Sequence, residues 1–132
     1  RQMCIRDRFV EYLKEYASAE NKTVFLTSHI IQDMELLIDD CMIMDYGRLL
    51  LHKPVKEIME GFRRFRFTSS ADICFGQDEG IWNCEHIGNN WELYSFLPTA
   101  EVAHKLKQYG IEQFKEENLS LEDAFIGLTG KY

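Results

Sequence analysis

Residues 23–29 read TVFLTSH, and this stretch decides the fold class. Its first five residues are β-branched, aromatic or aliphatic and apolar on both faces, which is typical of a buried strand in a parallel sheet. An amphipathic helix is predicted before it, over Phe9–Ala17, because apolar residues recur there at helical spacing. Helical spacing returns after it, with Ile31, Met34 and Ile38 on one face. Helix, strand and helix in this order indicate an α/β layer.

The residues that follow extend this layer. A second apolar strand is predicted at 41–44, and a turn at 45–48 leads it back into 49–51 as a hairpin. Pro54 suits the first turn of a short helix that Gly61 ends. These strands are too few for a sheet that is covered on both faces, so we expect further strands upstream of this sequence.

After Gly61 the pattern changes to that of a small α+β domain. Residues 62–67 read FRRFRF, a mixture of phenylalanine and arginine whose last four residues alternate with the period of a strand with one buried face. The remaining predicted elements are strands at 81–87, 91–97 and 111–115, a helix capped by Thr99 and stopped by Gly110, and a last helix that begins at Ser120. We therefore divide the chain into 1–61, a partial α/β core, and 62–132, an α+β domain.

The net charge limits the partners. Fifteen basic and 22 acidic residues give a net charge of -7. Nucleic acids and anionic membranes bind positive surfaces, so neither is expected as a partner. Arg63, Arg64 and Arg66 form a local basic cluster, which we interpret as a solvated strand face.

The cysteines and the hydropathy pattern point to a cytosolic chain. Cys4, Cys41, Cys74 and Cys84 have no spacing typical of zinc ligands, so we expect reduced thiols and no metal site. No apolar stretch approaches the roughly 20 residues that a membrane span requires, and no signal peptide is visible.

His29 is the candidate for chemistry. It follows the predicted buried strand, at the edge of the sheet where α/β proteins bind ligands. A histidine there can hydrogen-bond a phosphate oxygen and exchange a proton near neutral pH. It can equally be a half-buried strand-end histidine with a local partner, and its position alone leaves both interpretations open.

Four segments carry a resemblance to the switch-histidine region of ABC transporter ATPases: 23–29, 33–39, 42–44 and 47–49. The resemblance implies that His29 contacts the γ-phosphate of ATP. It also implies that Asp33 and Glu35 occupy the two acidic helix positions of the family and Asp39 the aspartate after them. Asp40 departs from the family, which usually has a basic residue there, so the local charge pairing differs.

The C-terminus carries a second resemblance. Residues 120–130 read SLEDAFIGLTG, which is similar to the ending of ATP-binding subunits that serve multidrug- and antibiotic-export-type ABC systems. Together the motifs imply the C-terminal part of a P-loop NTPase (RecA-like) core, followed by an accessory domain that caps or regulates it. The alternating aromatics of that domain are interpreted as packing residues: Phe65, Phe67, Trp82, Trp91 and Phe96.

Three motifs of the family do not occur in the sequence: G-x-x-x-x-G-K-[ST], an L-S-G-G-Q-like signature, and an apolar strand ending in Asp-Glu. The family places all three upstream of the switch histidine, so we expect a C-terminal fragment that starts just before the switch-histidine strand. The resemblance implies a parent subunit that binds ATP and Mg²⁺, hydrolyses ATP as a dimer, and drives a transmembrane permease from the cytoplasmic face of the cell membrane. The fragment alone is expected to be inactive and to bind no nucleotide stably.

Two other classes of protein fit parts of the sequence. A stand-alone, non-catalytic α+β binding or regulatory module remains the alternative. A hydrolase that uses Ser28 and His29 is disfavoured, because neighbouring residues on a strand point to opposite faces and no G-x-S-x-G elbow is present. The incomplete sheet also predicts that the first 60 residues are loosely held, whereas the chain from Phe62 onward folds better.

Overall fold

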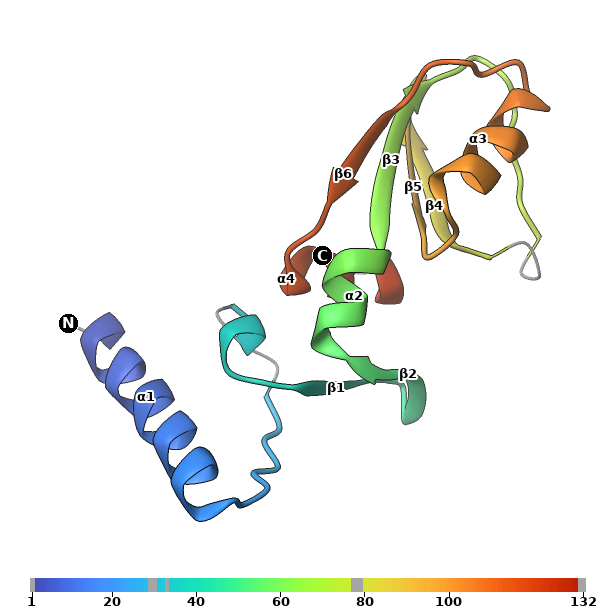
Figure 1. Cartoon of the computed structure of the whole chain (residues 1–132). Coiled ribbons are helices and arrows are strands. Elements are labelled where there is room, and N and C mark those ends of the chain that lie inside the picture. Colours follow the sequence, from blue (N-terminus) through green and yellow to red (C-terminus); the bar gives the residue numbers. More distant parts are fainter. Residues whose placement is uncertain (1, 29–30, 33, 77–79, 131–132) are drawn as a thin grey trace. The chain divides into compact units, whose positions relative to one another are not determined.

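The computed structural model describes residues 2–28, 31–32, 34–76 and 80–130. The chain is of mixed α and β composition, with two antiparallel sheets (Figure 1). It divides into two compact units, Arg1–Ile38 and Asp39–Tyr132, and each is described by itself. The predicted domain boundary between 61 and 62 concerns the parent architecture and stays a prediction.

The first unit contains one long helix. Helix α1 spans Gln2–Glu20, which confirms the helix predicted over residues 9–17 and extends it at both ends. It ends where Asn21 takes a positive φ of 49°, and the Lys22 amide donates to the Ala17 carbonyl at 3.1 Å. Among the described residues of this unit none is buried. Little apolar surface therefore stabilises it.

The prediction of a strand at residues 23–27 is wrong. Residues 22–28 have no regular secondary structure, and Val24, Phe25 and Leu26 are 42%, 76% and 40% exposed. A buried parallel strand needs a neighbour on each side to pair its amides and carbonyls. No described residue pairs with this segment in a ladder, so its β propensity alone does not form a strand.

The prediction of a continuous helix after residue 29 is also wrong. The described residues form a single 3₁₀ turn, η1, at Met34–Leu36. The amides of Leu37 and Ile38 both donate to the Met34 carbonyl, at 2.9 Å and 3.0 Å respectively. Neither Ile31 nor Gln32 is helical. A short helix without a covered apolar face has too little packing to hold it.

The second unit begins with the predicted hairpin. Strands β1 (Asp40–Asp45) and β2 (Arg48–Pro54) pair antiparallel. Tyr46 and Gly47 join them with φ values of 50° and 71°, which is the type I′ geometry that suits the twist of a hairpin. Ile43 and Leu51 lie opposite each other and are both buried, so one face of the hairpin belongs to the core.

A short helix links the hairpin to the main sheet. Helix α2 spans Val55–Gly61, with Pro54 as its N-cap. The Phe62 amide closes its last turn on the Ile58 carbonyl at 2.9 Å. Val55 and Ile58 are buried, and the bounds confirm the short helix predicted between Pro54 and Gly61.

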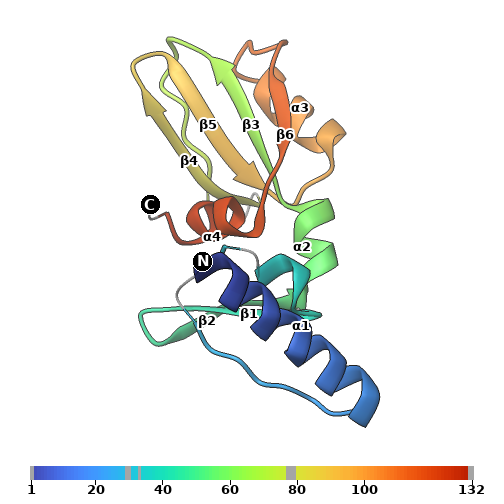
Figure 2. The same ribbon diagram turned by 90° about the vertical axis from the view of Figure 1, so that its left-hand side faces the viewer.

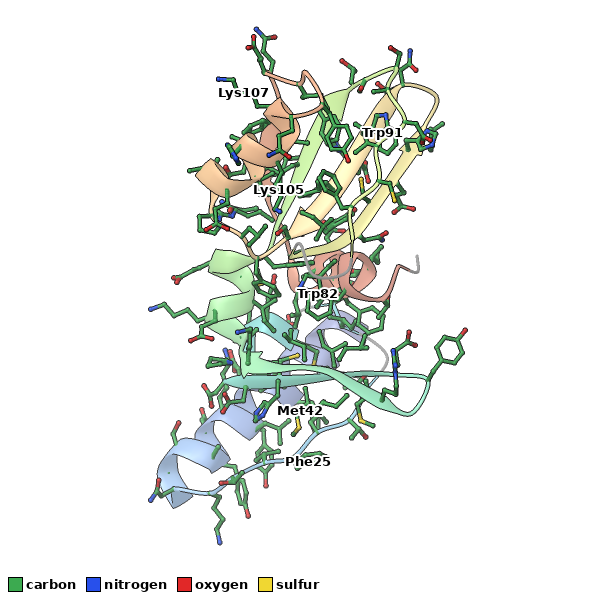
Figure 3. The ribbon with its side chains drawn as sticks, turned by 90° about the vertical axis from the view of Figure 1, so that its right-hand side faces the viewer. Phe25, Met42, Trp82, Trp91, Lys105 and Lys107 are labelled. Atoms are coloured by element: carbon green, nitrogen blue, oxygen red, sulfur yellow. The ribbon has the colours of Figure 1, made fainter. Side chains whose placement is uncertain are left out.

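The main sheet has four antiparallel strands in the order β4-β5-β3-β6 (Figure 2). Their bounds are β3 Arg63–Thr68, β4 Ile81–Ile87, β5 Asn90–Ser95 and β6 Lys115–Asn118. The turn Gly88-Asn89 joins β4 to β5. Trp82 near the start of β4 and Trp91 near the start of β5 lie at opposite ends of this hairpin (Figure 3).

Helix α3, Thr99–Lys107, covers one face of this sheet (Figure 2). Buried side chains from the sheet, the helix and the two connections form the core between them: Phe65, Phe67, Ile73, Trp91, Leu93, Val102, Leu106 and Ile111. The alternation of residues 62–67 therefore predicted the correct buried face. Trp82 is 39% exposed, yet its ring packs edge-on against Phe62 and Phe96, with centroids 6.4 and 6.2 Å apart.

Helix α4, Leu121–Thr129, packs on the opposite side, against α2 and β4. The Ser120 hydroxyl accepts a hydrogen bond from the Asp123 amide at 3.1 Å, so the predicted N-cap is confirmed. Gly130 ends the helix in the left-handed conformation, with φ 73°. Beside α4, Phe62 packs on Phe96 with ring centroids 4.6 Å apart.

Two local predictions in this unit are wrong. Thr99 does not cap α3, because Pro98 is the N-cap and the Thr99 hydroxyl donates to Glu116 at 2.6 Å. Residues 111–114 do not form a strand, and β6 begins only at Lys115. Ile111 instead folds back on α3, where its amide donates to the Leu106 carbonyl at 3.1 Å.

Candidate functional site

His29, the predicted nucleotide contact, lies outside the described residues, as does Asp33. The segment that leads to His29 is described as far as Ser28 and is irregular. The assignment of His29 therefore stays a prediction.

The other acidic residues of the switch-histidine resemblance are described. Glu35 lies in η1. Asp39 is exposed, and its backbone carbonyl accepts a hydrogen bond from the Val55 amide at 2.9 Å. Asp40 lies opposite Pro54 at the end of the hairpin. These aspartates therefore help to position the start of α2 through their backbone. Across the described ranges no group of three or more His, Cys, Asp or Glu side chains is placed to hold a metal ion.

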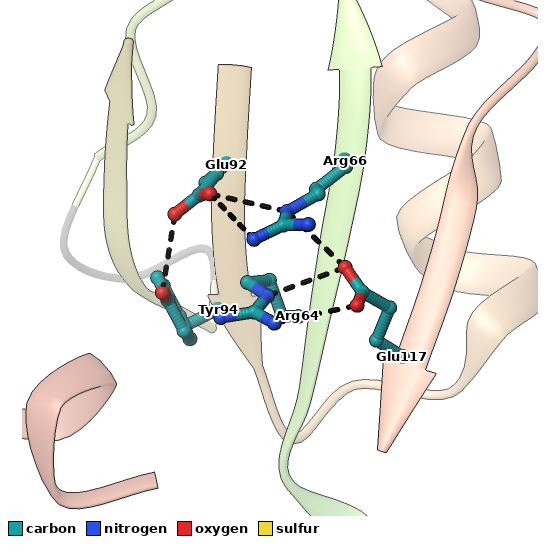
Figure 4. Close-up of polar contacts among 5 residues, drawn as sticks. All are labelled: Arg64, Arg66, Glu92, Tyr94 and Glu117. Carbon is teal, nitrogen blue, oxygen red and sulfur yellow. Dashed lines mark hydrogen bonds and ion pairs between the residues drawn. The ribbon is translucent and has the colours of Figure 1, made fainter. Parts of the chain in front are cut away.

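The most extensive polar site of the second unit lies on the face of the sheet that α3 does not cover (Figure 4). Arg64 donates from Nε and Nη2 to the two carboxylate oxygens of Glu117, at 3.3 Å each. Arg66 lies 3.1 Å from Glu92 and 3.2 Å from Glu117. Tyr94 donates its hydroxyl to Glu92 at 3.3 Å. We call these five residues the arginine–glutamate network.

The network follows from the strand register. Arg64 lies opposite Tyr94 and Glu117, and Arg66 lies opposite Glu92, so alternate residues of three neighbouring strands meet on one face. Arg64 is only 17% exposed and Glu117 21%. The interpretation of the arginines as a solvated strand face is therefore wrong for Arg64.

The pKa values reflect this pairing. Burial tends to lower the pKa of Arg64, but its hydrogen bonds with Glu117 and Tyr94 outweigh burial and raise it. The hydrogen bond from Arg64 lowers the pKa of Glu117. Burial raises the pKa of Tyr94. The two arginines of the network face its two glutamates, so opposite charges meet within it. Such a network stabilises strand pairing and offers no unbalanced charge to a ligand.

A second polar cluster lies on the α3 side of the sheet. Arg63 donates to Glu116 at 2.7 Å and to the Leu97 carbonyl at 3.3 Å. The Thr99 hydroxyl accepts a hydrogen bond from Arg63 at 3.3 Å and donates one to Glu116 at 2.6 Å. This cluster fixes the start of α3 on the sheet. The sequence analysis did not predict these clusters; the signal that could have indicated them is the arginines of residues 63–66 together with Glu116 and Glu117.

A hollow beside α3 is lined by Ala103, Lys107, Ile111, Glu112 and Phe114. Its polar groups are one lysine and one glutamate, and sites that bind small molecules are usually concave and bring several polar groups together. No helix of the described chain is both long and apolar enough to cross a membrane.

Similarity to known proteins points to one class, the ATP-binding proteins of transport systems. The relative is the bacitracin transport ATP-binding protein BcrA of Bacillus licheniformis, which is 29% identical over 123 aligned residues. The alignment covers 86% of this chain but 40% of the relative, so the chain spans less than half the length of that protein. No protein-family profile matches the chain, and no solved structure matches it.

This relation supports the coarse part of the sequence resemblance, an ATP-binding protein of the ABC transporter type. Because the alignment covers 86% of the chain, it includes the neighbourhood of His29.

Proposed function

We propose that this chain is part of the ATP-binding subunit of an ABC transporter. The observation that carries the proposal is the similarity to a bacitracin transport ATP-binding protein along most of the chain. The switch-histidine-like segment at 23–29 and the export-type ending at 120–130 support it independently. The parent subunit would couple ATP hydrolysis to transport across a membrane.

Within that function His29 contacts the γ-phosphate of ATP. A histidine at this place donates a hydrogen bond to the phosphate, whose charge changes during phosphoryl transfer. The glycine-rich loop, the signature and the Mg²⁺ carboxylate are not encoded in residues 1–132. The described residues therefore form no nucleotide site by themselves, and ATP and Mg²⁺ would be held mainly by other parts of the subunit.

The four-stranded unit serves as the accessory domain in this proposal. The arginines and glutamates of its polar network are paired with each other, and Phe65, Phe67 and Trp91 lie in its core, so we assign it a structural or regulatory role. The subunit would work with a permease and a second ATP-binding subunit, at the cytoplasmic face of the membrane.

A stand-alone, non-catalytic α+β binding module is the second candidate. One observation favours it: all the buried residues that the structure describes lie in the second unit, from Ile43 onward. A unit with its own core can fold and bind a partner without a nucleotide. In that case His29 would have no chemical role.

The coding sequence upstream of Arg1 separates the two candidates. A G-x-x-x-x-G-K-[ST] loop, a signature motif and an apolar strand ending in Asp-Glu, all in the same frame, are expected for an ABC transporter subunit. A start codon next to Arg1 with none of these motifs would contradict the proposal and leave the binding module.

A further inference from the structure

The main sheet ends in two edge strands, β4 and β6, which differ in how they are protected. Edge strands present unpaired amides and carbonyls, and proteins usually guard them with short length and charge. Strand β6 is guarded in this way, because it has only four residues and includes Lys115, Glu116 and Glu117. A twofold pairing of β6 with its own copy would bring Glu116 or Glu117 opposite itself.

Strand β4 lacks such protection over its regular part. It has seven residues, of which only Glu85 and His86 are titratable acidic or basic side chains. The bulge at Trp82 ends the regular ladder at Asn83, and from Asn83 to Ile87 the strand pairs with β5 without interruption. Trp82 is 39% exposed and Ile87 86% exposed. An open, little-charged edge of this kind is a template for another strand.

The ladder with β5 determines which groups of β4 are available. Ile87 and Asn90 flank the two-residue turn and form a hydrogen-bonded pair, so hydrogen-bonded and non-hydrogen-bonded pairs alternate from there. The amides and carbonyls of Cys84 and His86 therefore point away from β5. The described ladder of β4 connects to β5 alone, which leaves these groups for a second strand.

A twofold axis restricts how β4 can pair with a second copy. Antiparallel neighbours related by such an axis place one residue opposite its own copy and keep each face of the sheet continuous. The axis at Glu85 would oppose two carboxylates. The axis at Cys84 instead places Asn83 opposite Glu85 of the second copy, twice, and opposes no like charges.

We propose that β4 is a self-association edge, where two copies of this chain pair antiparallel about Cys84 and extend the sheet across both. This contact needs no nucleotide, so it is separate from any pairing of ATP-binding subunits through ATP. It is modest in size, because it consists of a few backbone hydrogen bonds and the partial covering of Ile87 and Trp82. A weak, concentration-dependent dimer is the expected state.

The charge of residue 83 tests both the contact and its register. Sedimentation equilibrium of the 132-residue chain without nucleotide would compare the wild type with Asn83→Lys and Asn83→Glu. Asn83→Lys places an ammonium opposite Glu85 of the second copy and should tighten the dimer, whereas Asn83→Glu opposes two carboxylates and should weaken it. Two equivalent pairs per dimer give an expected change of about tenfold in the dissociation constant in each direction.

Two controls keep the comparison interpretable. Thermal unfolding of each variant at high dilution shows whether the monomer is intact, and Glu112→Lys alters the charge of the chain away from β4. Equal effects of Asn83→Lys and Asn83→Glu on association would overturn the register. A wild type that stays monomeric up to about 1 mM would overturn self-association as a whole.

Amide hydrogen exchange gives a second, residue-level readout. The amides of Cys84 and His86 point away from β5, so their protection should rise with protein concentration. The amides of Asn83 and Glu85 pair with β5 and should be protected at every concentration. Protection of Cys84 and His86 that does not change with concentration would contradict the proposal.

Discussion

Gly127 of α4 lies directly against the ring of Tyr94 on β5, which is how the last helix approaches the sheet so closely. A Cβ atom at position 127 would lie 2.9 Å from both Cγ and Cε2 of that ring. Real carbon contacts are longer, so any side chain at 127 forces the helix or the ring to move. Tyr94 also belongs to the arginine–glutamate network, so this contact connects α4 to that network.

Gly127→Ala should lower the free energy of unfolding by about 1–2 kcal/mol, because the overpacking outweighs the better helix propensity of alanine. Denaturant unfolding followed by circular dichroism measures the change. Gly61→Ala is the matched control, since its Cβ would meet Phe96 at an ordinary 3.4 Å. The control should be neutral or slightly stabilising, and equal losses in both variants would contradict the packing argument.

Glu117→Gln should lower the free energy of unfolding by about 1–2 kcal/mol at pH 7, because Arg64 loses a charged acceptor while it remains largely buried. Glu112→Gln, at an exposed position, should change it little. Urea unfolding of the three proteins in one buffer provides the comparison.

The same variant has a defined pH dependence. Folding lowers the pKa of Glu117 through its hydrogen bond with Arg64, so the carboxylate stabilises the fold fully above its unfolded pKa of about 4.5. This contribution is lost as the pH falls through the lower, folded value. The difference between the wild type and Glu117→Gln should therefore shrink below pH of about 4.5. A difference that grows on acidification would show that the pKa moves in the opposite direction.

Hydrogen exchange should divide the chain near residue 39. None of the described residues in 2–38 is buried, whereas Ile43, Leu51 and Ile58 of the hairpin and α2 are. Amides of β1, β2 and α2 should thus be protected to a similar extent as those of β3, and α1 should exchange much faster. This moves the expected limit of the loosely held part from residue 60 to residue 38. Equal protection of α1 and β3 would contradict it.

The sequence predicted best where local signals and packing agree. The hairpin at 40–54 has a turn with positive φ between two apolar runs, and β3 has phenylalanines two residues apart, at 65 and 67. Ser120 and Gly130 are helix caps with side-chain or backbone chemistry of their own. These elements were predictable because each contains its own determinants.

The failures occurred where an element depends on distant residues. The 23–27 run has high β propensity, but a strand also needs partner strands, which the described residues do not supply. Thr99 is a good cap residue in isolation, yet Arg63 and Glu116 compete for its hydroxyl. The arginine–glutamate network was missed because its paired residues lie far apart in sequence: Arg66 and Glu92 by 26 residues, and Arg64 and Glu117 by 53. The candidate site depends on His29, for which the sequence remains the source of evidence.

The central claim is that His29 contacts the γ-phosphate in an ABC transporter ATPase. The most direct test is ATP hydrolysis by the complete product of the gene, comparing the wild type with His29→Ala and with His104→Ala, an exposed histidine of α3. Loss of one positioned donor to the transition state predicts a decrease of about 100-fold or more for His29→Ala and near-normal turnover for His104→Ala. Equal turnover of all three proteins, or no hydrolysis by the wild type, would contradict the account.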